Sequence, residues 1–133
     1  MPASVSLSAN AQFGENIKNS SWISKDAVMF EAFKPNGTMD YQRISSSLKD
    51  SKGDVLIDKD YINFGNFNYG VVAAAAGYPL DDALSYAAKL NRYHALTNRN
   101  INTSGKYGGN VRNEYYIRMG YLAYTSDKIK GAQ

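Results

Sequence analysis

Hydrophobic residues recur at helical spacing most clearly between positions 80 and 94. Ala83, Ala87, Leu90 and His94 follow one another at offsets of four, three and four residues, so they share one face of a helix. Acidic residues at positions 81 and 82 and basic residues at positions 89 and 92 suit the two ends of its dipole. The pattern predicts an amphipathic helix whose buried face ends in the chain's single histidine.

Three further segments show helical spacing and capping residues. Residues 24–33 predict a helix capped by Ser24, and residues 38–48 predict another capped by Thr38. A last helix is predicted at 113–124, with Asn113 as its cap. One side of that helix carries Gly120 beside apolar and aromatic residues, so a neighbouring backbone can approach it closely.

The motif NFGNFNYG at residues 63–70 runs directly into the small apolar stretch VVAAAAG at 71–77. One interpretation is that the glycines form a tight turn ahead of a closely packed helix that ends at Gly77 and Pro79. The functional interpretation has Asn66, Asn68 and Tyr69 pointing into a cleft, where they orient substrate or a catalytic water. The sequence leaves both interpretations open.

The fold predicted from these segments is mostly α, a compact single-domain helical fold. A short strand is compatible with residues 55–57, so an α+β fold with a minor strand pair is the alternative, but no strong partner strand follows. We expect a flexible tail at 1–20 that joins a longer parent protein, the folded domain at 21–126, and a frayed end at 127–133.

The amino-acid composition limits which partners and which metal sites the chain can have. The 133 residues carry 15 basic and 12 acidic side chains, a formal charge of +3, which permits a polyanionic partner. With no cysteine and one histidine, a zinc site built from thiolates or several imidazoles is excluded, and we expect no metal and no cofactor. A hard cation such as magnesium, held by carboxylates, stays open as the alternative. The first twenty residues show no secretory signal, and no stretch is apolar enough to insert into a membrane. A polar loop at 97–111 contains Arg99 and Lys106.

Several of these segments together resemble the bacterial toxin 44 domain of polymorphic toxins. The resemblance covers about residues 28–124 and is carried by DYQ at 40–42, Tyr61, FGNFNYG at 64–70, the small-residue helix ending in AAG, and NEYYIRMG at 113–120. It implies the C-terminal payload of a secreted antibacterial effector used in interbacterial competition. Such a payload is delivered into a target cell by its parent module, is neutralised by a cognate immunity protein, and is described as a ribonuclease. Acids expected ahead of the motif and before the last helix are absent here, and Asp60 and Glu114 are the nearest substitutes.

Two hydrolytic chemistries fit the residues. A metal-independent ribonuclease acting in the target cytoplasm needs an acid, a base and a cation, for which His94, Asp40, Asp60 and Glu114 with Arg92, Arg99 or Lys106 are the candidates. A peptidoglycan hydrolase acting in the periplasm needs two carboxylates that flank a glycosidic bond, drawn from Asp40, Asp58, Asp60 and Glu114. Each candidate also has an ordinary structural explanation: His94 as a satisfied helix-face histidine, and the acids as solvated surface groups.

Overall fold

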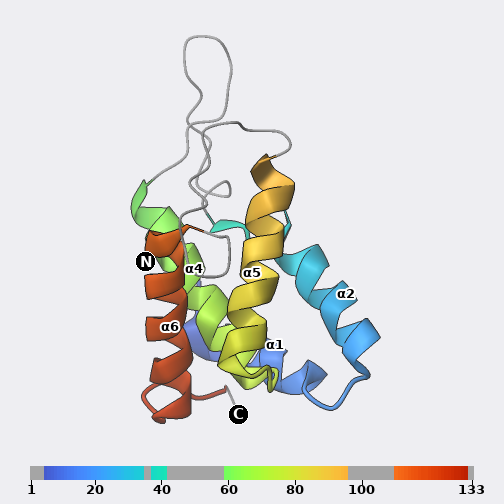
Figure 1. Cartoon of the computed structure of the whole chain (residues 1–133). Helices are drawn as coiled ribbons and strands as arrows, with labels where there is room; N and C mark the ends of the chain where they lie inside the picture. The colour runs from blue at the N-terminus through green and yellow to red at the C-terminus, as the bar shows by residue number, and fades with distance from the viewer. Residues whose placement is uncertain (1–4, 35–36, 42–58, 96–109, 132–133) are drawn as a thin grey trace.

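The computed structural model describes residues 5–34, 37–41, 59–95 and 110–131, without the side chains of 59–60 and 91–95. These residues form helices and no strand, which confirms the mostly α fold. The helices are α1 (Leu7–Ile17), α2 (Trp22–Phe33), α4 (Lys59–Ala75), α5 (Leu80–Ala95) and α6 (Val111–Thr125). Figure 1 shows α4 at the centre, with α6 and α5 on either side of it and α1 and α2 towards the lower end. The predicted strand at 55–57 lies outside the described residues.

Helix α4 contains the whole NFGNFNYG motif, so the interpretation of its glycines as a tight turn is wrong. Gly65 faces open space within the described structure, whereas Gly70 lies against the backbone of α6. A Cβ atom on Gly70 would overlap the carbonyl oxygen of Ile117 and would lie 2.8 Å from the nitrogen of Tyr121. Glycine is therefore required at position 70 by the approach of a second helix and not by a turn.

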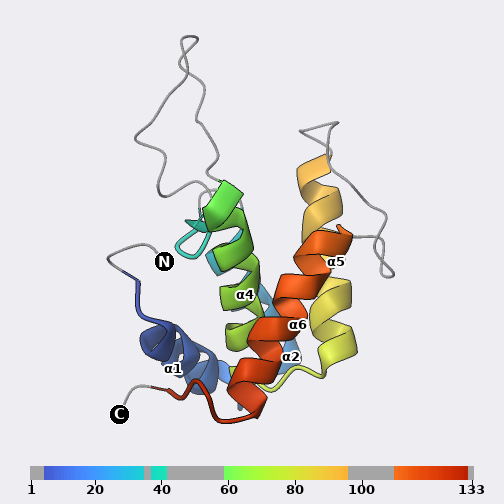
Figure 2. The same ribbon diagram turned by 90° about the vertical axis from the view of Figure 1, so that its left-hand side faces the viewer.

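Helix α6 has the reciprocal feature at Gly120, as its sequence predicts. A Cβ atom there would overlap the carbonyl oxygen of Phe67 on α4. Figure 2 shows α4 and α6 crossing near their C-terminal halves and separating towards their N-terminal ends. Two glycines, one on each helix, thus set the distance of closest approach between α4 and α6, which share the most extensive contact among the described helices.

Helix α1 packs against the small-residue half of α4, so the prediction of a flexible tail is wrong for Leu7–Ile17. Ala11 is fully buried, and a Cβ atom on Gly14 would lie 2.6 Å from the carbonyl oxygen of Val72. Ser6 caps the helix by accepting a hydrogen bond from Ala9 N at 3.1 Å. The small residues Ala11 and Gly14 let α1 approach α4 closely, and Leu7, Phe13 and Ile17 pack against the core on either side of them.

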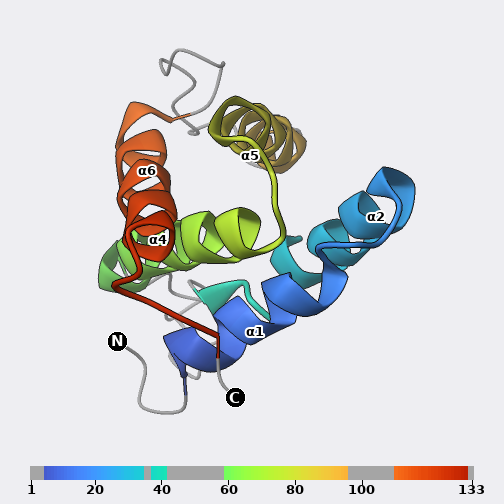
Figure 3. The same cartoon turned by 90° about the horizontal axis from the view of Figure 1, so that it is seen from below.

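The C-terminal segment also departs from the predicted frayed end. Asp127 adopts a positive φ of 63°, and the amide of Lys128 donates to Ala123 O at 3.0 Å, which together form a glycine-free Schellman cap. The chain then turns back, and Ile129 packs on the small cluster of Ala11, Val71 and Ala75. Figure 3 shows this segment passing beside α1.

Two helices are capped by the residue type predicted from the sequence, but at a different position. The cap of α2 is Ser21 and not Ser24, since Ser21 Oγ accepts from Ser24 N at 3.3 Å. The cap of α6 is Asn110 and not Asn113, because Asn110 Oδ1 accepts from the amides of residues 112 and 113. Gly77 ends α4 with a φ of 83°, as predicted. Thr38 lies in a turn, and residues 42–48 of the helix predicted after it lie outside the described residues.

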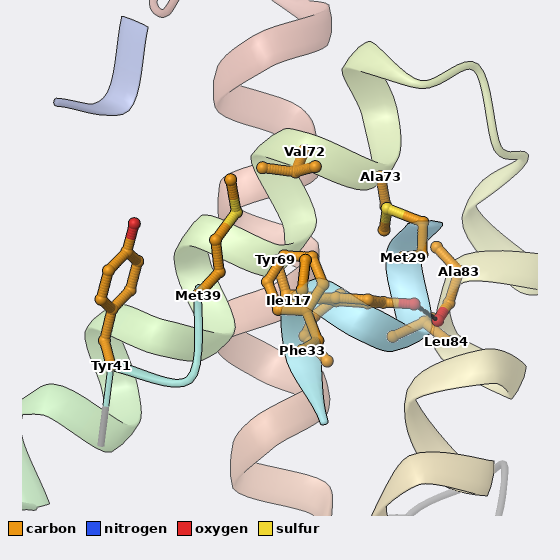
Figure 4. Packing of buried hydrophobic residues seen from close by; sticks show 11 residues of the cluster. Met29, Phe33, Met39, Tyr41, Tyr69, Val72, Ala73, Ala83, Leu84 and Ile117 are labelled. Atoms are coloured by element: carbon orange, nitrogen blue, oxygen red, sulfur yellow. Dashed lines mark hydrogen bonds between the residues drawn. The ribbon is translucent and has the colours of Figure 1, made fainter. Parts of the chain in front are cut away.

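The core forms where α2, α5 and α6 meet one side of α4. Tyr69 lies at its centre, with its ring edge-to-face on Phe33 at 5.0 Å and its hydroxyl donating to Ala83 O at 2.7 Å. Figure 4 shows this ring beside Ile117, with its hydroxyl directed at the start of α5. The other members of the cluster come from α2, α4, α5 and the 37–41 segment: Met29, Ala32, Met39, Tyr41, Val72, Ala73 and Leu84.

The glycine contacts generate a stability prediction with an internal control. We expect Gly70→Ala and Gly120→Ala each to lower the free energy of unfolding by about 3 kcal/mol, because the added methyl group meets a backbone atom that cannot move aside alone. Gly65→Ala should raise it by up to about 1 kcal/mol, since alanine is favoured in a helix and the site is open. Urea unfolding followed by far-UV circular dichroism measures all three. Equal effects at Gly65 and Gly70 would contradict the observed crossing.

Candidate functional site

Two acidic side chains are buried in the described structure, Asp40 with 6% and Glu114 with 5% of its surface exposed. Surface carboxylates are normally solvated, and a buried carboxylate must be compensated by hydrogen bonds or charge. Both residues have polar interactions within the protein. Their burial separates them from the exposed acids of α5, Asp81 and Asp82, and makes them the acidic candidates to consider first.

Glu114 lies in the first turn of α6, where the N-terminal end of the helix favours a negative charge. It shares a face with Ile117 and Tyr121, three and seven residues further on. Ile117 packs in the core with Tyr69, and the Tyr121 hydroxyl donates to Tyr78 O at 2.6 Å in the link between α4 and α5. This face of α6 is therefore turned towards α4 and α5, and Glu114 lies at its N-terminal end.

Asp40 is held on a different side of α4. Its neighbour Met39 contacts Asn68 through sulfur at 3.7 Å, and Tyr41 packs on Phe64 with ring centroids 5.4 Å apart. Asn10 of α1 donates to both the Tyr41 hydroxyl and Asn68 Oδ1, at 2.7 and 2.9 Å. Figure 3 shows α4 lying between the 37–41 segment and α6. The two buried acids are therefore separated by the central helix.

The amides and phenol of the central motif are engaged within the fold. Asn68 is fully buried in the contact with Asn10 and Met39, and Tyr69 is a core residue. Asn66 turns back on its own helix and donates to Ile62 O at 3.0 Å. The interpretation in which Asn68 and Tyr69 point into an open cleft is corrected by these contacts, and the half-buried Asn66 is the one of the three with solvent access.

The remaining predicted residues differ in how far the structure describes them. His94 and Arg92 belong to the last turn of α5, and Asp60 to the first turn of α4, but their side chains lie outside the described residues. Arg99 and Lys106 lie outside them entirely. The earlier members of the His94 stripe face inwards: Ala83 is buried, and Ala87 and Leu90 pack against the core. By helical register, position 94 continues the face that α5 turns towards α4 and α6.

Asn63 supplies a signal that sequence reasoning missed. Its Oδ1 atom is buried, and it has no hydrogen-bond partner in the part of the chain that the structure describes. It lies one turn before Phe67 and on the side of α4 that α6 covers. A buried acceptor without a partner marks a place for a water molecule or a ligand hydroxyl. No sequence pattern distinguishes this asparagine from the two others in the motif, Asn66 and Asn68.

Tyrosine hydroxyls are used mainly to join helices. Tyr78 donates to Asp26 Oδ1 at 2.6 Å and Tyr86 to Asp26 O at 3.0 Å, so both fasten α2 to the rest of the bundle. Burial and the nearby Asp26 raise the pKa of Tyr86 to about 12, and burial followed by the hydrogen bond to Asp26 raises the pKa of Tyr78 still further. Burial is the main cause of the raised pKa of Tyr69, and the nearby Tyr86, Tyr78 and Asp26 add to it. These phenols stay protonated at neutral pH and act as donors.

A polar hollow of about 680 Å³ lies between α1 and the C-terminal end of α6. It is lined by Gln12, Glu15, Tyr124, Thr125, Asp127, Ile129, Lys130 and Gly131. Glu15 already accepts a hydrogen bond from the Tyr124 hydroxyl at 2.9 Å. No predicted site residue lines this hollow, which lies at the opposite end of α6 from Glu114, so we assign it no chemistry.

The described residues contain no group of three or more histidine, cysteine, aspartate or glutamate side chains arranged to hold a metal ion. Among the helices described, none has the length and apolar character needed to cross a membrane. Comparison with known proteins adds no relative: no family model, curated protein or solved structure matches this chain.

The buried phenol of Tyr69 makes stability depend on pH. Its pKa is raised in the folded state, so its contribution is complete below the unfolded pKa of about 10 and is lost as the pH rises towards the folded value. Tyr69→Phe should lower the free energy of unfolding by about 1 kcal/mol at neutral pH, because the hydrogen bond to Ala83 O is lost. Between about pH 9 and about pH 11, the free energy of unfolding of the wild type should fall by about 1.4 kcal/mol relative to that of this variant, because only the wild type has this phenol to ionise on unfolding.

Urea unfolding at the two pH values measures the difference. Tyr115→Phe, at an exposed tyrosine, is the control and should follow wild type throughout. If the difference in unfolding free energy between wild type and Tyr69→Phe were the same at both pH values, burial of this phenol would be contradicted.

Proposed function

We propose that this chain is the toxic payload of a secreted antibacterial effector and that it cleaves RNA in the target cell without a metal ion. The observation that carries the proposal is Glu114, a buried carboxylate on the face of α6 that is turned towards α4 and α5. The buried register of α5, which runs through Ala83, Ala87 and Leu90, reaches position 94, where the sequence has its single histidine. The resemblance to the toxin 44 domain and the formal charge of +3 support an RNA substrate.

RNA cleavage by such a pair is a transesterification. Glu114 takes the proton of the 2′-hydroxyl, whose oxygen attacks the adjacent phosphorus, and the bond to the 5′-oxygen breaks. The His94 imidazolium gives its proton to that leaving oxygen, so the products are a 2′,3′-cyclic phosphate and a free 5′-hydroxyl. Arg92 at the end of α5, with Arg99 and Lys106 beyond it, are the candidates to stabilise the charge on the phosphorane. In this account Asp40 is not needed, and Asp60 remains an alternative acid.

The competing function, hydrolysis of peptidoglycan, needs two carboxylates about 5 to 10 Å apart across one glycosidic bond. Among the residues that the structure describes, Asp40 and Glu114 are the two buried acids, and α4 lies between them. We therefore place the ribonuclease first. In either case we propose that a cognate immunity protein neutralises the chain and that a parent module delivers it.

The two buried acids provide a matched pair of variants. Glu114→Gln should abolish killing when the domain is expressed in the cytoplasm of a susceptible bacterium, and His94→Ala should do the same. Asp40→Asn removes an equally buried carboxylate from the other side of α4 and should leave killing intact. Circular dichroism of each purified variant checks that it is folded. Loss of killing with Asp40→Asn but not with Glu114→Gln would overturn the assignment.

The substrate is tested by location and by product. We expect killing when the domain is kept in the cytoplasm and survival when an added signal peptide sends it to the periplasm. Rounding and lysis from the periplasm alone would favour the cell wall as substrate.

Purified domain should cleave RNA equally well with and without EDTA, and the fragments should end in a 2′,3′-cyclic phosphate. Complete loss of cleavage in EDTA would contradict a metal-independent reaction.

A further inference from the structure

The outer face of α6 carries a continuous row of exposed apolar side chains. Val111, Tyr115, Met119 and Leu122 are spaced by four, four and three residues, so they form one stripe along the helix. Their exposed fractions are 57%, 58%, 45% and 55%. We call these four residues the outer stripe. Figures 1 and 3 show α6 at the edge of the described structure, with α4 on its inner side.

The outer stripe lies opposite the buried face of α6. Ile117 and Gly120 face α4, and the stripe is centred about half a turn of the helix away from them. A surface helix normally carries charged and polar residues on that face, and a helix that is apolar on both sides is usually buried. Contiguous apolar patches of this kind on a folded protein mark interaction sites. The stripe therefore indicates a surface that another molecule covers.

The charges beside the stripe select the kind of partner. Arg112 borders it on one side and Arg118 on the other, and the single acidic residue of α6, Glu114, is buried. Each flank of the stripe therefore carries one arginine, Arg112 exposed and Arg118 half-exposed, and no exposed acid of α6 opposes them. A partner whose apolar surface is edged by carboxylates would gain attraction on both flanks, and this attraction also favours fast association.

A second copy of this chain fits the stripe poorly. In an antiparallel pair of α6 helices, equivalent flanks face each other, so Arg118 of one copy would lie near Arg118 of the other. Parallel pairing would set the Arg112 flank against the Arg118 flank. Either arrangement brings arginine towards arginine across an apolar seam, which costs free energy.

We infer that the outer stripe of α6 is a docking surface for an acidic protein that presents an apolar helix or groove edged by carboxylates. This inference rests on the exposed face of α6 and not on the hydrolytic site, whose residue Glu114 lies on the inner face. Affinity should come from burial of Tyr115 and Leu122. The preference for an acidic over a basic partner should come from Arg112 and Arg118.

The test uses the full chain and two synthetic amphipathic helices with the same leucine seam, one edged by glutamates and the other by lysines. We expect the glutamate-edged helix to bind more tightly, with an affinity that falls as salt is added. Tyr115→Lys and Leu122→Lys should each weaken binding by about tenfold or more. Ile23→Lys, which changes an equally exposed apolar residue on α2, is the control and should leave binding unchanged.

Charge reversal gives the sharpest discrimination. The double variant Arg112→Glu, Arg118→Glu should reverse the preference and bind the lysine-edged helix more tightly. Failure of both helices to bind, or equal binding of both, would overturn the inference. A dimer detected by sedimentation that Leu122→Lys abolishes and Ile23→Lys preserves would assign the stripe to a second copy instead. Stripe-dependent binding to anionic lipid vesicles would assign it to a membrane surface.

Discussion

The backbones of α4 and α6 meet at two glycines, and the remainder of the structure is arranged around that contact. Gly70 lies on the carbonyl of Ile117, and Gly120 lies on the carbonyl of Phe67, so neither position accepts a side chain. This close approach draws Ile117 against Tyr69 and forms the core that α2 and α5 complete. Because the crossing lies towards the C-terminal halves of both helices, their N-terminal ends diverge, and Glu114 lies at this diverging end.

The same central helix has different chemistry on each side. The side towards α1 and the 37–41 segment is closed by an amide and phenol network of Asn10, Asn68 and Tyr41. Towards α6, one turn before Phe67, lies Asn63, whose buried Oδ1 has no hydrogen-bond partner among the described residues. A satisfied polar network rigidifies a core, whereas a buried acceptor without a protein partner is met by a water molecule or by a group that binds there. This difference is a second physical reason to look for the proposed reaction on the Glu114 side.

Sequence patterns predicted the parts of the fold that local chemistry determines. The spacing and charges of α5, the glycine that ends α4 and the close approach at Gly120 all follow from such chemistry, and each is observed. The patterns failed where a distant segment decides the outcome. Helix α1 has small residues whose value appears only against α4, and the 63–70 glycines favour a turn until α6 is placed on Gly70.

The candidate site was predicted only in part, for the same reason. The abundance of asparagine and tyrosine favoured a polar cleft, but Asn68, Tyr69 and Tyr78 are used inside the protein to join helices. Asp40 and Glu114 were both named from the sequence, yet their burial and their separation by α4 depend on packing between distant segments. Asn63 was not named as a site residue, because an unsatisfied acceptor is a property of the folded environment.

The central proposal is that RNA binds on the side of α4 that faces α6, where Glu114 lies. It is tested most directly by titrating the ¹⁵N-labelled chain with an RNA whose 2′-hydroxyls are methylated, which binds but cannot be cleaved, and following the amide resonances. We expect the shifts to centre on the first turns of α6, the last turn of α5 and Asn63. Shifts centred instead on residues 37–41 and α1, or no shifts at saturating RNA, would contradict the account.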